Sequence, residues 1–173
     1  MKAISWGARR TNFDEFSEQM TRLDRFRLVG AKESQEKSFD TIRAQYPEGT
    51  RFVVLPMAMD NAAIGFGDAE KNVEAQHEAL AELAAKYPDQ LLPFATCHPE
   101  DEASVKTAQD CLKNKGFKGL KLYPKLGYYP DHSVLLEDIY PLPQKPDGSW
   151  RPVLSHCSRG GLYQKGLSKA ERD

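Results

Sequence analysis

Several side chains that could do chemistry stand at the ends of short apolar runs in this sequence. The runs cover residues 51–57, 91–98, 116–124 and 152–157. They show little polar alternation, which is typical of strands buried on both faces of a parallel sheet. Functional residues of parallel βα folds gather at the carboxyl ends of the strands. The candidates for an active site are therefore the polar residues near those ends: His98, Lys121, Tyr123 and His156.

His156 ends the last apolar run and is followed by Cys157, Ser158, Arg159 and two glycines. A neutral imidazole at such a position is a good ligand for zinc or another divalent transition metal. The alternative is a histidine that is hydrogen-bonded within the end of the sheet. Arg159 could bind a substrate carboxylate, since guanidinium pairs with it bidentately and glycines let backbone N–H groups approach. An ordinary flexible loop is the alternative for Arg159.

Lys121 and His98 each admit a chemical and a structural interpretation. Alternation along the third run puts Lys121 and Tyr123 on the face opposite Leu120, and makes Tyr123 a candidate to bind substrate. A buried lysine needs a carboxylate, a substrate anion, a carbonyl to form a Schiff base, or carboxylation as a metal bridge. Alternatively, its amine reaches water at the rim. His98 precedes Pro99 and could act in catalysis, cap the following helix or line the rim.

The other histidines and the cysteines are expected to be structural. His77 is expected on the solvated face of a helix, and His132 at the surface or as a cap. Cys97, Cys111 and Cys157 lack zinc-finger or C-x-x-C spacing. Neighbouring strand residues point to opposite faces, so a Cys-His doublet cannot hold one ion while extended. The cysteines are expected to be reduced packing thiols of a cytoplasmic protein.

Helical patterns separate the apolar runs. The helix over residues 68–87 is expected to begin at the cap Asp68, and the helix after Pro99 to end at Gly116. A shorter helix after residue 131 must stop before Pro141, and residues 12–26 and 34–46 are also predicted to be helical. The strand starts are about 25 to 40 residues apart, against about 31 per unit of an eight-unit barrel. This pattern predicts a small doubly wound domain or half a barrel.

Composition narrows the function classes. The 173 residues are enough for one domain, and 24 Lys and Arg balance 25 Asp and Glu. A net charge near zero argues against a nucleic-acid or membrane-surface binder. The first residues lack the apolar stretch expected of a secretory signal, and no apolar run approaches the roughly 20 residues of a membrane helix. No G-x-G-x-x-G follows a strand, so nucleotide binding is not supported. The chain is expected to be soluble and cytoplasmic.

The apolar runs resemble those of the amidohydrolase-related family of TIM-barrel hydrolases. The specific parts are Gly-Phe-Lys-Gly-Leu-Lys-Leu-Tyr-Pro at 116–124 and Val-Leu-Ser-His-Cys-Ser at 153–158. The resemblance is strongest over residues 34–165 and implies strands two to five of a (β/α)₈ barrel. The expected fold is therefore α/β, a partial TIM barrel of about four parallel strands with intervening helices, forming a single domain over residues 1–173.

The resemblance also implies an activity and a cofactor. In this family a metal activates water for hydrolysis of C–N or C–O bonds, and in some members it supports decarboxylation. The family's strand-five histidine ligand matches His156, which implies zinc, and Lys121 is the only match to the carboxylated lysine of some branches. The family's His-x-His pair is absent, and its later histidine and aspartate ligands have no match before Asp173. The resemblance thus predicts a truncated hydrolase of a small-molecule substrate, inactive alone.

Two alternatives remain open at this point. Lys121 could be the nucleophile of a Schiff-base barrel aldolase, which needs a lysine with a depressed pKa. The half-barrel could also be a non-catalytic binding or scaffold module that pairs with a second copy or a complementing chain. Stable folding as a metal-free dimer would favour the scaffold, whereas aggregation through open sheet edges would favour a fragment.

Overall fold

The computed structural model describes residues 20–21, 24, 34–58, 72–142 and 148–156. The chain divides into two compact units, Met1–Thr50 and Arg51–Asp173, and each is described by itself. The single domain expected from the sequence stays a prediction. Arg159 and most of the helix expected over residues 12–26 lie outside the described residues.

The described part of the first unit contains the predicted helix that precedes the first strand. This helix is α2 (Gln35–Arg43), and Ser34 caps it in an extended conformation. The Ser34 hydroxyl accepts the N–H of Lys37 at 3.2 Å, which satisfies one of the backbone donors that a helix leaves free at its start. Arg43 pairs with Asp40 at 2.8 Å on the same helix.

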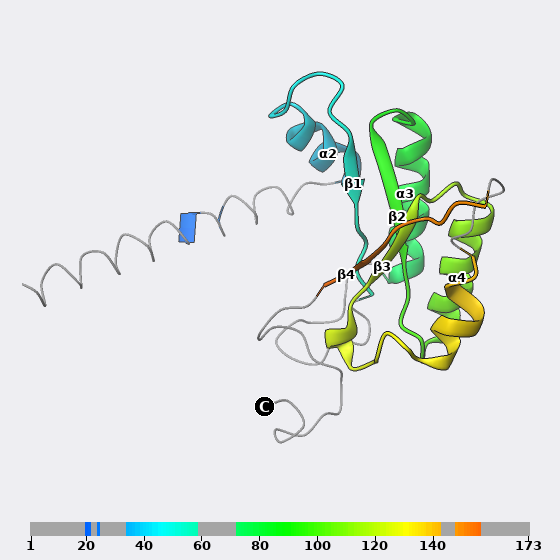
Figure 1. Ribbon diagram of the computed structural model, residues 1–173. Coiled ribbons are helices and arrows are strands. Elements are labelled where there is room, and N and C mark those ends of the chain that lie inside the picture. Colours follow the sequence, from blue (N-terminus) through cyan, green and yellow to red (C-terminus); the bar gives the residue numbers. More distant parts are fainter. Residues whose placement is uncertain (1–19, 22–23, 25–33, 59–71, 143–147, 157–173) are drawn as a thin grey trace, which may run out of the picture. The chain divides into compact units, whose positions relative to one another are not determined.

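The second unit is built on a four-stranded parallel sheet. Its strands are β1 (Phe52–Val54), β2 (Leu91–Thr96), β3 (Gly119–Leu122) and β4 (Val153–Ser155). They lie in the order β1-β2-β3-β4, and every neighbouring pair is parallel (Figure 1). All four strands fall within the apolar runs, so their predicted positions are confirmed. A parallel sheet in chain order, with helices between the strands, is part of a (β/α)₈ barrel.

Two helices connect the first three strands. α3 (Val73–Lys86) begins after Asn72, whose side chain accepts the N–H of Ala75 at 2.9 Å, so the cap expected at Asp68 is wrong. Asn72 takes this place because its amide oxygen reaches a free N–H of the first turn. α4 (Glu102–Lys113) begins after Asp101, which accepts the N–H of Ala103 at 3.1 Å.

The segment after β3 forms two short helical turns. A 3₁₀ turn, η2 (Pro124–Leu126), follows the strand directly, and a π-helical turn, η3 (Leu135–Ile139), comes later. The second turn is the short helix expected after residue 131, and it stops before Pro141 as predicted. Gly116, expected to end α4, lies beyond the C-cap Asn114 and adopts the left-handed conformation with φ of 70°.

The two faces of the sheet differ in what covers them. Successive right-handed crossovers in a sheet of this order place the helices on one face, and α3 and α4 lie on the same side of the sheet (Figure 1). Ala95 and Leu120 are register partners, and both are fully buried. Lys121 and its register partner Thr96 lie on the face opposite to these two residues. The expectation that Lys121 points away from the helix layer stays a prediction.

None of the helices in the described part of the chain has the length and apolarity needed to cross a membrane.

Candidate active site

His156 lies at the carboxyl end of the sheet, directly after β4. Its N–H donates to the carbonyl of Leu122, the last residue of β3, at 3.1 Å, which fixes its backbone against that strand. Its side chain is exposed, and its ring stacks on that of Tyr123 with centroids 4.8 Å apart and planes 8° apart. An exposed imidazole at this edge is available to bind a ligand or an ion.

Lys121 lies on β3 on the same face as this ring pair. Its side chain is only 6% exposed, and its Nζ is 5.3 Å from the centroid of the Tyr123 ring. This distance is in the range of a cation–π contact. Its carbonyl accepts the hydroxyl of Thr96 on β2 at 2.9 Å. The fold thus brings together three residues that the sequence proposed, Lys121, Tyr123 and His156.

His98 lies directly beyond β2 and is buried, with 1% of its surface exposed. Its Nδ1 accepts the N–H of Glu100 at 3.3 Å, so Nε2 carries the proton and donates to the carbonyl of Leu126 at 3.4 Å. Both ring nitrogens are therefore used by backbone groups. Burial lowers the pKa of His98, which keeps the ring neutral. The catalytic role of His98 stays a prediction, and its contacts are those of a residue that ties β2 to η2.

His77 corrects the expectation of a solvated position on α3. Its side chain is fully buried, its Nδ1–H donates to the carbonyl of Val73 at 2.6 Å, and its Nε2 accepts the N–H of Thr96 at 3.0 Å. The imidazole therefore joins α3 to the last residue of β2. Val73, His77 and Leu80 follow the spacing of one helix face, and this spacing could have identified His77 as buried.

Two further polar residues fix the chain beyond the ends of strands, and no pattern in the sequence singled them out. Gln76 accepts the N–H of Met57 at 3.3 Å and donates to its carbonyl at 3.1 Å, which fixes the chain beyond β1. Ser104 on α4 accepts the N–H of His98 at 3.0 Å. Both residues lie in the first turns of helices, beside the carboxyl ends of the strands. Only the packing of the helices shows that they point inward.

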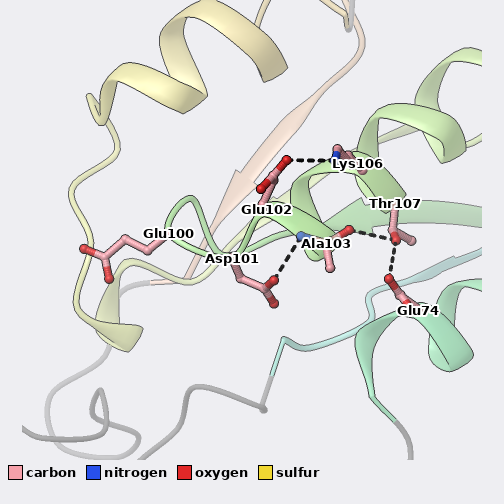
Figure 2. Close-up of a pocket in the computed structure, with 7 residues that line it drawn as sticks. All are labelled: Glu74, Glu100, Asp101, Glu102, Ala103, Lys106 and Thr107. Atoms are coloured by element: carbon pink, nitrogen blue, oxygen red, sulfur yellow. Dashed lines mark hydrogen bonds and ion pairs between the residues drawn. The ribbon is translucent and has the colours of Figure 1, made fainter.

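An acidic hollow lies between the starts of α3 and α4 (Figure 2). Its lining residues are Glu74, Glu100, Asp101, Glu102, Ala103, Lys106 and Thr107. Glu102 pairs with Lys106 at 2.7 Å, and Glu74 accepts the hydroxyl of Thr107 at 3.4 Å. Asp101 caps α4. Asp101 and Glu102 therefore stabilise the first turns of α4, and Glu74 connects α3 to α4.

The family model described as amidohydrolase matches residues 15–163, which is most of the chain. The chain belongs to the amidohydrolase family. No curated protein and no solved structure gives a significant match. Membership confirms the resemblance seen in the strand runs and supports a hydrolase-type function for this amidohydrolase chain.

A metal site of this amidohydrolase would need more donors than the described residues bring together. Among these residues, no group of three or more His, Cys, Asp or Glu side chains could hold an ion. His156 contributes one imidazole, and structural or catalytic zinc takes at least three protein ligands. The described donors alone therefore do not fit a complete metal centre, and no catalytic step follows from them.

The two described cysteines of the amidohydrolase chain are free and buried. Burial raises the pKa of the Cys97 thiol to about 12 and that of the Cys111 thiol to about 11. Thiols with such pKa values stay protonated near neutral pH and are poor nucleophiles. The prediction that they are packing thiols is confirmed for these two residues, and Cys157 lies outside the described part.

The buried histidines predict a loss of stability in mild acid. Burial lowers the pKa of both His77 and His98 in the folded chain. In the unfolded chain these histidines have pKa values of about 6.5, so below that pH the unfolded chain binds more protons than the folded chain. Stability is therefore complete above about pH 6.5 and is lost below it, by up to roughly 1.4 kcal/mol per pH unit for each histidine. Urea unfolding at a series of pH values measures this slope.

His77→Phe is the control for the pH effect, because phenylalanine has no proton to bind. Below about pH 6.5, the free energy of unfolding of this variant should fall less steeply with pH than that of the unmodified chain. The difference should be up to roughly 1.4 kcal/mol per pH unit, which corresponds to one proton. An unchanged slope would show that His77 is protonated equally in the folded and unfolded states.

Proposed function

We propose that this chain is part of a metal-dependent hydrolase of the amidohydrolase type, with its active site at the carboxyl end of the sheet. His156 supplies one ligand of a divalent metal, which we take to be zinc, and the other ligands come from outside the described residues. The metal when bound would supply an activated water for the cleavage of a C–N or C–O bond, and decarboxylation is the related reaction.

The convergence of Lys121, Tyr123 and His156 at one edge of the sheet is the observation that supports this proposal. The three residues come from or directly follow two neighbouring strands, and they are joined by a ring stack of 4.8 Å and a cation–ring distance of 5.3 Å. Carboxyl ends of parallel strands are where barrel enzymes place their chemistry. An exposed imidazole beside a buried cation can bind a metal and an anionic group of a substrate together.

The other residues have supporting roles in the proposal. Lys121 and Tyr123 face the substrate, and the Lys121 ammonium stabilises negative charge close to His156. Arg159, three residues beyond His156, binds a carboxylate of a small-molecule substrate. His98 keeps its place as a catalytic candidate only if it exchanges its backbone partners when substrate binds.

Metal binding by the chain extended with its adjoining coding sequence tests the role of His156. The proposal expects His156→Gln to weaken zinc binding by at least about tenfold, since even changes beyond the direct ligands cost about 10- to 100-fold. His132→Gln is the matched control, because His132 is a half-buried histidine whose Nδ1 accepts the N–H of Val134 at 3.3 Å. Equal zinc affinity of the His156 variant and the unmodified extended chain, measured by calorimetry, would contradict the proposal.

The truncation prediction has its own test within this proposal. The chain alone should not hydrolyse p-nitrophenyl esters or anilides above the rate of added zinc in buffer. The adjoining coding sequence should contain an upstream His-x-His and downstream histidine and aspartate ligands. Metal-dependent turnover by residues 1–173 alone would contradict the idea that the site is incomplete.

A second candidate, a Schiff-base aldolase, rests on the burial of Lys121. A lysine that is 6% exposed loses hydration of its charged form, and a neutral amine is the form that attacks a carbonyl. Borohydride reduction with small aldehydes or ketones should then leave a stable adduct on Lys121. Trapping on the exposed Lys106 to the same extent would remove this candidate.

We also propose a complementing chain or a second copy as a partner. Val53 of β1 and Leu154 of β4 are 47% and 41% exposed, and within the described residues each of these strands pairs with one neighbour. Light scattering after gel filtration distinguishes a defined dimer from aggregation through these strands. The free thiols of Cys97 and Cys111 support a reducing, cytoplasmic location.

A further inference from the structure

The loop after β3 closes on itself within six residues. The N–H of Leu126 donates to the carbonyl of Tyr123 at 2.9 Å, and the N–H of Gly127 donates to that of Pro124 at 2.9 Å. Gly127 then adopts φ of 102°, a left-handed conformation that favours glycine. This turn reverses the chain and returns Tyr128 to the beginning of the loop.

Tyr128 bonds directly to the residue that starts the loop. Its hydroxyl accepts the N–H of Tyr123 at 2.6 Å, and its side chain is 5% exposed. The phenol thus takes the place of a strand partner for the first residue beyond β3. Since the donor is a backbone group, this bond fixes the main chain from which the Tyr123 ring projects.

His98 holds the same loop from the side of β2. Its Nε2–H donates to the carbonyl of Leu126 at 3.4 Å, and its ring meets the Tyr128 ring edge-on, with centroids 5.0 Å apart and planes 79° apart. The His98 backbone is in turn bound to Ser104 of α4 at 3.0 Å. The loop is therefore held by the connection after β2, whose backbone is itself bound to α4, and this limits where Tyr128 can move.

The ring held by this loop lies against the proposed metal ligand. Tyr123 stacks on His156 with planes 8° apart, and His156 is otherwise an exposed side chain at the strand end. A stacked neighbour removes rotamers that an exposed imidazole would otherwise sample, so the direction of the His156 ring depends on Tyr123.

We propose that Tyr128 is a positioning residue that sets the orientation of His156 through the backbone and ring of Tyr123. This inference rests on the proposed function for its importance to catalysis, although the link between the three residues is independent of any metal. Tyr128 touches no reacting group in this arrangement and acts only through Tyr123.

Proton NMR of the His156 ring tests the link, because a stacked aromatic ring shifts the imidazole protons upfield. The His156→Gln spectrum assigns the signals, and Tyr123→Leu gives the shift without the stack. Tyr128→Phe, which deletes one oxygen, should move the His156 signals at least half of the way to the Tyr123→Leu position. Unmoved His156 signals in Tyr128→Phe would overturn the proposal.

Tyr140→Phe is the matched control for loss of a phenol. The Tyr140 hydroxyl donates to the carbonyl of Pro130 at 2.5 Å in the same connection after β3, and its removal should leave the His156 signals in place. A purely structural role of Tyr128 would give both variants the same effect. The signals of His77, which is buried between α3 and β2, report whether each variant remains folded.

Amide exchange in the unmodified chain provides a test that does not depend on a variant folding. The Tyr123 N–H should exchange at least about tenfold more slowly than that of the exposed Tyr129, because it has a buried acceptor. Equal rates would overturn the proposal. If the Tyr123 and Tyr128 results hold while His156→Gln leaves zinc binding unchanged, the proposed metal role fails and the positioning link stands.

Discussion

Replacing His77 with alanine is expected to lower the free energy of unfolding by about 3–8 kcal/mol, the sum of two costs. The variant leaves the buried N–H of Thr96 without the Nε2 acceptor that it has at 3.0 Å. An unsatisfied buried donor costs about 1–3 kcal/mol. The missing imidazole also leaves a cavity beside Phe117, whose ring lies 5.7 Å from it, and large-to-alanine changes in cores cost about 2–5 kcal/mol. Urea unfolding measures the sum.

Two variants separate the parts of this effect. His77→Phe fills the space and removes the Nε2 acceptor together with the Nδ1–H donor to the carbonyl of Val73, so its cost should be about 1–3 kcal/mol. His156→Ala is the matched surface control, because that side chain is exposed, and its cost should stay within about 0.5 kcal/mol. A His77→Ala chain as stable as His156→Ala would show that the bridge between α3 and β2 contributes nothing.

Replacing Gly119 with alanine is expected to destabilise the sheet by about 2–3 kcal/mol, the upper part of the range for overpacking. An added Cβ would lie 2.5 Å from two ring atoms of Phe94 and 2.6 Å from the carbonyl oxygen of Pro152. The Pro152 carbonyl also accepts the N–H of Leu120 at 3.0 Å, so moving it strains the pairing of β3 with β4. The effect should appear as a lower midpoint of thermal unfolding.

The double variant with Phe94→Leu tests the mechanism. Its cost should be smaller than the sum of the two single costs, because the shorter side chain removes the contact with the ring while the contact with Pro152 remains. Gly116→Ala is the control glycine: it has φ of 70° and open space around its Cβ, so its cost of about 1 kcal/mol is conformational. Additive costs at 94 and 119 would exclude the steric explanation.

The sequence was sufficient to locate the strands and the edge that carries the candidate site. Short continuous apolar runs favour strands of a parallel sheet, because such strands are buried on both faces. The strand β2 (Leu91–Thr96) lies within the run predicted for it. The place of His156 followed from the strand before it, since a residue that directly follows a parallel strand must lie at its carboxyl end. Alternation then put Lys121 and Tyr123 on one face.

The sequence did not show which polar side chains of the helices turn inward. His77 was expected to be solvated because Glu74 and Glu78 lie near it in the chain, yet it is fully buried beside β2. Short-range composition describes the average surroundings of a segment, whereas burial depends on the rotation of the helix about its axis. That rotation is set by packing against the sheet. The expectation for His77 was wrong because its burial depends on contacts between residues far apart in the sequence.

What the sequence alone determined is the parallel sheet, the family and the residues at its carboxyl edge. Only the tertiary structure decided that Tyr123 stacks on His156, that Tyr128 fixes Tyr123 and that His98 uses both ring nitrogens on backbone groups. The physical reason is that hydropathy and strand alternation depend only on residues that are close together in the sequence. Hydrogen bonds and ring contacts between connections depend on distances that exist only after the strands have paired.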